Sequence, residues 1–190
     1  MPSAWLVSKI PILFRPVYTD TGSSTELLFA DSPPVYDNRS VDSIRLVLAR
    51  EYAVDLKAQA RKIVRDFKRC SPLPFFLPEP VRKDGGQVFI PFKMRRPRIT
   101  RDRVYGFADL TYIDRLEPDQ RNCRLHLTTG AVVELLCSAA TARANLALGN
   151  DIASCYLRSA PAEDDQIVQA ARLLLHRLER IEGYLQQLAK

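Results

Sequence analysis

With 190 residues, of which 46% are hydrophobic, the chain can form a substantial core, so a largely disordered protein is excluded. The formal net charge is +6, and this charge is concentrated in one part of the chain. From Lys57 to Arg103 there are 14 Lys or Arg against 4 Asp or Glu, which leaves the rest of the chain slightly acidic. A basic middle predicts an anionic partner at one face. The alternative is a solvated face that carries excess positive charge.

The sequence disfavours three other classes of protein: membrane proteins, secreted proteins and metal-binding proteins. No apolar run approaches the roughly 20 residues that cross a bilayer, so no membrane association is expected. The N-terminal apolar run is broken by Lys9 and Pro11, unlike a signal peptide, which favours a cytoplasmic protein with reduced thiols. No metal site and no cofactor are predicted, because the cysteines lie far apart and form no C-x-x-C pair. They are Cys70, Cys123, Cys137 and Cys155.

The N-terminal half predicts strands followed by helices. Residues 5–18 alternate loosely and contain two prolines, which predicts an edge strand or two short strands. Turn residues at 20–24 precede a short strand at 25–30. Ser40 is a candidate helix N-cap, and a second helix is expected over 55–68. That second helix has an apolar stripe, and its opposite face carries Lys57, Arg61, Lys62, Arg65 and Lys68.

The C-terminal half predicts mainly antiparallel strands. Prolines bracket a short extended or edge strand at 75–77, and Asp84–Gly86 is a turn into the next strand. Residues 108–116 predict one strand, and a hairpin follows over 123–137. A short helix is expected from Ser138 to Leu148, ended by Gly149-Asn150. The predicted fold class is α+β, a mainly antiparallel β-sheet with two central helices and a long C-terminal amphipathic helix.

A basic loop between two strands is the strongest functional signal. In residues 93–103, six of eleven side chains are cationic and one is anionic. Guanidinium groups suit phosphate oxygens because they stay charged and donate paired hydrogen bonds. We therefore expect this loop to bind DNA, with the basic helix face holding backbone phosphates beside it. The candidate DNA-binding residues are Lys93, Arg95, Arg96, Arg98, Arg101, Arg103, Lys57, Arg61, Lys62 and Arg65.

The C-terminal tail shows a heptad pattern. From residue 167 onward, apolar side chains recur at alternating steps of four and three, which is typical of a coiled-coil seam. This pattern predicts a homo-oligomer, with residues 1–158 as the DNA-binding domain and 159–190 as the oligomerisation helix. A long helix that packs on its own domain is the alternative. The seam residues are Ile167, Ala171, Leu174, Leu178, Ile181, Leu185 and Leu188.

The sequence contains no catalytic constellation, and we predict that the protein is not an enzyme. His126 and His176 lie in unlike contexts and in no nucleophile motif. The Gly85-Gly86 pair is a turn rather than a phosphate cradle. Tyr105, Phe107 and Tyr112 could stack on bases, although their spacing places some of them in the core.

The order of these features resembles the ComK family of bacterial competence transcription factors. The resemblance covers roughly residues 17–148. It rests on an Arg in the central helix (Arg61), a Pro-rich strand at 71–76, the run 88–92 before the basic loop, and the hairpin at 127–135. The chain departs from the family pattern at Leu73, Phe92 and Phe107, and the heptad tail is not a family feature.

This resemblance implies a transcriptional activator of the competence type that binds AT-rich double-stranded DNA as an oligomer, largely through the minor groove. Residues 107–148 also resemble LytTR-type DNA-binding domains, which implies the same class of function. Two other functions stay open from the residues alone. The same charges would serve RNA binding, and the heptad helix could belong to an adaptor that binds another protein.

Overall fold

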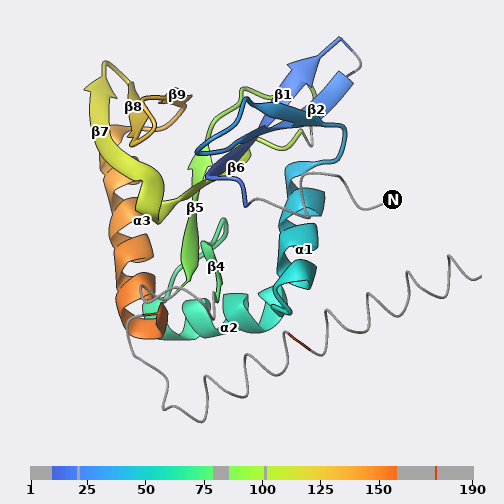
Figure 1. Cartoon of the computed structure of the whole chain (residues 1–190). Helices are drawn as coiled ribbons and strands as arrows, with labels where there is room; N and C mark the ends of the chain where they lie inside the picture. The colour runs from blue at the N-terminus through green and yellow to red at the C-terminus, as the bar shows by residue number, and fades with distance from the viewer. Residues whose placement is uncertain (1–9, 21, 79–85, 101, 158–173, 175–190) are drawn as a thin grey trace, which may run out of the picture.

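The computed structural model describes residues 10–20, 22–78, 86–100, 102–157 and 174, and these residues form two antiparallel sheets and three α-helices (Figure 1). The mixed α+β class and the mainly antiparallel pairing are as the sequence predicted. The strands are β1 (Leu13–Thr19), β2 (Gly22–Leu28), β3 (Val35–Asp37), β4 (Phe75–Leu77), β5 (Gln87–Lys93), β6 (Tyr105–Asp109), β7 (Ile113–Asp119), β8 (Asn122–Leu127) and β9 (Val132–Leu135). The helices are α1 (Val41–Glu51), α2 (Leu56–Phe67) and α3 (Ala139–Ile152).

The larger sheet has six strands in the order β3-β2-β1-β6-β5-β4. Strand β4 lies at an edge, as its prolines predict, but β1 does not, so the prediction of an edge strand there is wrong. Pro16 is tolerated because β1 pairs with β6 only at Leu13 and Phe14, while Pro16 faces Thr25 of β2. The missing N–H of proline therefore lies where β1 has a partner on one side only.

The smaller sheet has the order β7-β8-β9 and begins where a single strand was expected. The predicted strand 108–116 is divided between two sheets by a 3₁₀ turn at Leu110–Tyr112. The side chain of Asp109, which is fully buried, accepts a hydrogen bond from the Thr111 amide at 3.0 Å and starts that turn. The sequence does not reveal this 3₁₀ turn. A single capping aspartate leaves the alternation of apolar and polar residues along the predicted strand almost unchanged.

Helices cover the larger sheet on both faces. On one face, α1 contributes Ile44 and Leu48 to a cluster that contains five phenylalanine rings. On the other face, Ile63 of α2 and Ile152 of α3 join a larger cluster with alternate residues of β5 and the inner residues of β8 and β9. Phe29 follows β2, and the other four rings come from β1, β4, β5 and β6. They are Phe14, Phe75, Phe89 and Phe107, and Phe75 stacks on Phe89 with centroids 4.9 Å apart.

Helix α3 is longer than predicted, because Gly149 does not end it. The helix continues to Ile152, and Gly149 is buried inside it against β5. A Cβ atom at this position would lie 2.5 Å from Cδ1 of Ile90. Glycine therefore serves close packing of helix on sheet here, which outweighs its low helix propensity.

Helix α2 and the basic loop lie at opposite ends of β5 (Figure 1). Helix α2 is tied to β4, where the Gln59 amide group donates to the Phe76 carbonyl at 2.8 Å and accepts from the Phe76 amide at 3.2 Å. Strand β4 pairs with the first residues of β5, and the basic loop leaves its last residue, Lys93. Seven residues of strand span roughly 20 Å, so the two basic elements do not form one patch.

The predicted oligomerisation segment, 159–190, lies outside the described residues except for Leu174, which is helical and has a 62% exposed side chain. Among the described helices, none is both long enough and apolar enough to cross a membrane.

Candidate nucleic-acid interface

The basic loop starts and ends on a well-paired ladder between β5 and β6. Beyond the last strand pair, Lys93 and Tyr105, the amides of Met94 and Arg95 both donate to the Val104 carbonyl, at 2.8 and 3.2 Å. Gly106 makes room for this arrangement, because a Cβ atom there would lie 2.6 Å from the Met94 sulfur. The loop thus projects from two buried strands of the sheet, β5 and β6, as the β-prone residues on both sides of it predict.

Tyr18 and Asp102 hold the far part of the loop. The Tyr18 hydroxyl accepts a hydrogen bond from the Arg98 amide at 2.7 Å and donates one to the Asp102 carboxylate. The same carboxylate oxygen accepts from the amides of Arg98 and Ile99 at 3.0 and 3.1 Å. A backbone bond from the Asp102 amide to the Ile99 carbonyl, 3.2 Å long, closes the turn. We call this arrangement the Tyr18–Asp102 clamp.

Hydrogen bonds to its ionised form lower the pKa of Asp102. The Tyr18 hydroxyl is the largest cause, and the amides of Ile99 and Arg98 and the charge of Arg95 act in the same direction. The carboxylate is therefore ionised at neutral pH, and the clamp is complete there.

Arg95 is a structural residue, although the sequence placed it among the phosphate contacts. Its side chain is only 6% exposed, and its Nη1 donates to the Val17 carbonyl at 3.2 Å and to the Ser23 hydroxyl at 2.9 Å. Its guanidinium carbon also lies 4.3 Å from the centroid of the Tyr18 ring. Arg95 thus ties the loop to the β1–β2 hairpin, and its hydrogen-bonding groups face inward.

Arg96 and Arg98 are exposed cations of the loop that make no ion pair among the described residues. The Arg98 guanidinium carbon lies 4.1 Å from the centroid of the Tyr18 ring, which holds the charge over the clamp. These two side chains can donate hydrogen bonds to phosphate oxygens without first breaking an ion pair within the described residues.

The other predicted loop cations are placed differently. Arg103 is exposed, but its Nε lies 2.7 Å from Oδ2 of Asp42 at the start of α1. Lys93 is half-buried at the end of β5. Arg101 lies outside the described residues.

An open groove of about 600 Å³ runs beside the loop, between β1 and the end of β9. Arg96 and Arg98 of the loop and Arg15 of β1 line it, but Arg15 is paired with Glu26 through Nε and Oε2 at 2.5 Å. Glu134 of β9 also lines the groove. The exposed positive charge is thus on the loop side.

The basic face of α2 is partly neutralised by neighbours. Arg65 pairs with Asp66 at 2.6 Å, and the Lys62 ammonium lies 4.1 Å from the centroid of the Tyr156 ring. Lys57 and Arg61 are exposed on the same helix. These four residues lie at the end of β5 away from the loop, so they do not flank it as the sequence analysis had expected.

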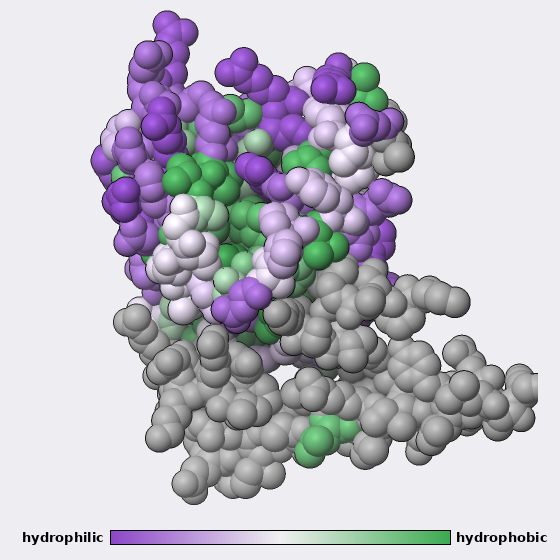
Figure 2. Space-filling model, turned by 45° about the horizontal axis from the view of Figure 1, so that its top comes forward, coloured by the Kyte–Doolittle hydropathy of each residue, from purple (hydrophilic) through white to green (hydrophobic). Residues whose placement is uncertain are grey.

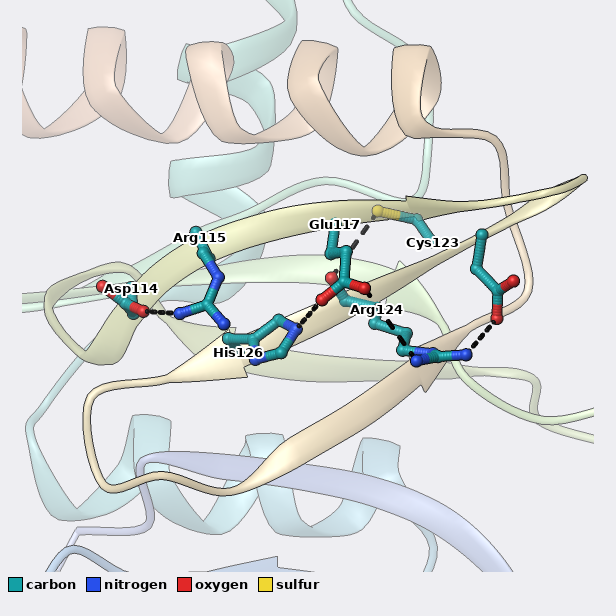
Figure 3. Close-up of polar contacts among 7 residues, drawn as sticks. Asp114, Arg115, Glu117, Cys123, Arg124 and His126 are labelled. Carbon is teal, nitrogen blue, oxygen red and sulfur yellow. Dashed lines mark hydrogen bonds and ion pairs between the residues drawn. The ribbon is translucent and has the colours of Figure 1, made fainter.

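The outer face of β7 and β8 carries paired charges (Figure 3). His126 Nε2 lies 2.7 Å from Oε2 of Glu117, and Arg124 pairs with Asp119 at 2.8 Å. Arg115 likewise pairs with the adjacent Asp114 at 2.8 Å. Acidic side chains pair with the cations here, so these pairs leave little net positive charge on this face.

Two of the functional residues in this site were missed by the sequence analysis. The sequence predicts only a strand region over residues 5–18, and nothing near Tyr18 in the chain points to residues 98–102. Asp102 could have been found from the sequence. An aspartate in a loop often accepts hydrogen bonds from backbone amides three or four residues before it, and here these amides belong to Ile99 and Arg98. Of the aromatic candidates, Phe107 is in the core, Tyr105 is 36% exposed and Tyr112 is half-buried.

Comparison with protein-family models, curated proteins and solved structures gave no match in any of the three. Within the described part of the chain, no three His, Cys, Asp or Glu side chains come together in a way that could hold a metal ion.

Replacement of Arg95 should affect stability, whereas replacement of its neighbour should not. We expect Arg95→Ala to lower the free energy of unfolding by about 1–3 kcal/mol, because the Val17 carbonyl loses a buried donor. Arg96→Ala is the matched control, and its exposed position predicts a change within about 0.5 kcal/mol. Urea unfolding of both variants measures this, and equal stabilities would show that the Arg95 contacts are not structural.

The clamp should open in acid. Because folding lowers the pKa of Asp102, its contribution to stability is present above the ordinary aspartate pKa of about 3.9 and is lost as the pH falls through the lowered value. The amide proton shifts of Arg98 and Ile99, followed by NMR, should therefore titrate together below about pH 4. In Asp102→Asn, the two amides should be insensitive to pH in this range. Identical titrations in both proteins would show that another group is responsible.

Proposed function

We propose that the protein binds double-stranded DNA through the basic loop and acts as a transcription regulator. The observation that carries this proposal is the pair of exposed guanidinium groups, Arg96 and Arg98, on a loop held by the Tyr18–Asp102 clamp. Both are unpaired among the described residues, whereas the other described arginines of the loop are held by the protein.

The clamp supports this proposal through the entropy of binding. A flexible loop loses conformational freedom when it binds, and this loss weakens the complex. Here Arg98 and Ile99 are already bonded through their backbone amides to Asp102, and Tyr18 fixes the Arg98 amide as well. The loop can therefore meet phosphates with little further ordering.

We propose the minor groove of AT-rich DNA as the binding site. A-tracts narrow this groove and deepen its negative potential, which favours the insertion of arginine. A loop that joins the ends of β5 and β6 suits that groove better than the major groove, which ordinarily takes a helix or a two-stranded ribbon. The resemblance to competence activators of the ComK type agrees with this choice.

The proposed active form is a homo-oligomer joined by the C-terminal heptad helix. Leu174, a seam residue, is 62% exposed in the single chain, so its side chain is available to a second copy. Two basic loops joined in this way would bind paired half-sites, whose spacing the dimer sets.

The salt dependence of binding tests the loop assignment. Each phosphate contact contributes about 0.9 to the slope of log K against log salt. The double variant Arg96→Ala/Arg98→Ala should thus flatten the slope by about two and weaken binding to an AT-rich duplex. Fluorescence anisotropy at several salt concentrations measures both quantities.

The double variant Lys57→Ala/Arg61→Ala is the matched control, because it removes the same charge from the other end of β5. It should keep a slope within about half a unit of the wild type. If instead the α2 variant alone flattens the slope, the interface is on α2. Preference for an RNA of the same sequence over duplex DNA would replace the proposal with RNA binding.

Oligomerisation can be tested at Leu174. Leu174→Asp places a charge in the predicted seam, where burial of an unpaired carboxylate is costly, so the variant should be monomeric. Gln169→Asp adds the same charge off the seam and should leave the oligomer intact. Sedimentation equilibrium gives the masses, and circular dichroism checks that both variants are folded. An unchanged mass for Leu174→Asp would refute the seam.

A further inference from the structure

The tip of the basic loop carries an apolar side chain that the proposed phosphate contacts do not explain. Ile99 is 71% exposed, more than the other large hydrophobic side chains that are exposed in the described residues, such as Leu174 at 62% and Tyr36 at 59%. Small apolar patches among hydrophilic side chains are visible at the upper end of the molecule in Figure 2.

The position of Ile99 is fixed rather than accidental. Its amide donates to the Asp102 carboxylate at 3.1 Å, and its carbonyl accepts from the Asp102 amide at 3.2 Å. Its side chain is β-branched and therefore has few rotamers. The Tyr18–Asp102 clamp thus presents a stiff apolar group at a defined place outside the core.

The charges around Ile99 select the kind of partner. Arg98 precedes it directly, Arg96 lies three residues before it, and both are exposed cations. An apolar protein surface gains nothing from these charges, whereas a polyanion with an apolar interior matches both features. Duplex DNA is such a partner, because its phosphates surround a stack of apolar base faces.

We propose that Ile99 is a wedge that inserts between two adjacent base pairs from the minor groove and kinks the DNA. This inference rests on the proposed DNA-binding function and adds to it a change in the shape of the DNA. Proteins that bind the minor groove use isoleucine, leucine and similar side chains in this way, and the insertion bends the duplex away from the protein. Pyrimidine–purine steps such as TA unstack most easily, so the wedge enters preferentially there.

A wedge and a phosphate contact respond differently to substitution. Insertion of Ile99 gains apolar contact but requires unstacking of a base step, and these effects largely cancel in the affinity. Ile99→Ala should therefore weaken binding by less than about tenfold and leave the salt slope unchanged, while most of the bend is lost. Arg96→Ala/Arg98→Ala should instead reduce the slope.

The experiment uses the full chain and an AT-rich duplex with one central TA step. A donor and an acceptor dye at the two ends report the bend by energy transfer, and 2-aminopurine at the TA step reports unstacking by its fluorescence increase. The variants are Ile99→Ala and, as a control for an exposed apolar side chain elsewhere, Leu46→Ala on α1, which is 49% exposed in the wild type. Moving the TA step by five base pairs provides a second control.

The expected result is a bent duplex and bright 2-aminopurine with wild type and with Leu46→Ala, and loss of both signals with Ile99→Ala at saturating protein. If Ile99→Ala retains the bend and the fluorescence, or if the wild type binds without bending the DNA, the wedge is refuted while DNA binding stands. If the wild type binds no duplex, the wedge falls together with the proposed function.

Discussion

Strand β5 is the constraint on which the rest of the structure depends. Its residues are buried on both faces, with Phe89 in the cluster under α1 and Ile90 in the cluster under α3. A strand covered on both sides cannot shift its register without exposing apolar side chains, so both of its ends are held in place. One end positions β4 and α2, and the other projects the basic loop.

The Tyr18–Asp102 clamp converts that rigid strand end into a rigid loop. Two adjacent arginines of the loop differ in their environment. Arg95 is buried against the β1–β2 hairpin, whereas Arg96 is exposed. Strand alternation does not explain the division, because β5 ends at Lys93 and the adjacent residues Met94 and Arg95 are both buried. It follows from the hydrogen bonds of the Arg95 side chain to Val17 and Ser23. Counting charges along the chain does not reveal it.

Ion pairs within the protein explain why the loop differs from the other described elements that carry arginines. Arg124 of β8 and Arg65 of α2 have carboxylates within 3 Å. An exposed ion pair contributes little to stability, but it does cancel the local field. The unpaired cations Arg96 and Arg98 therefore form a local positive centre, and the exposed apolar side chain of Ile99 lies beside them in the chain.

The sequence by itself determined the local features: the capped start of α1 at Ser40, the start of α2 near residue 55, the hairpin within 123–137 and the strands around the basic loop. These depend on residues within a few positions of one another, so a local pattern is enough to predict them. Only the tertiary structure decided the burial of Arg95, the place of Gly149 against Ile90 and the separation of α2 from the loop. The Tyr18–Asp102 contact joins residues 84 positions apart, and such a pairing depends on how the sheet folds rather than on any local signal.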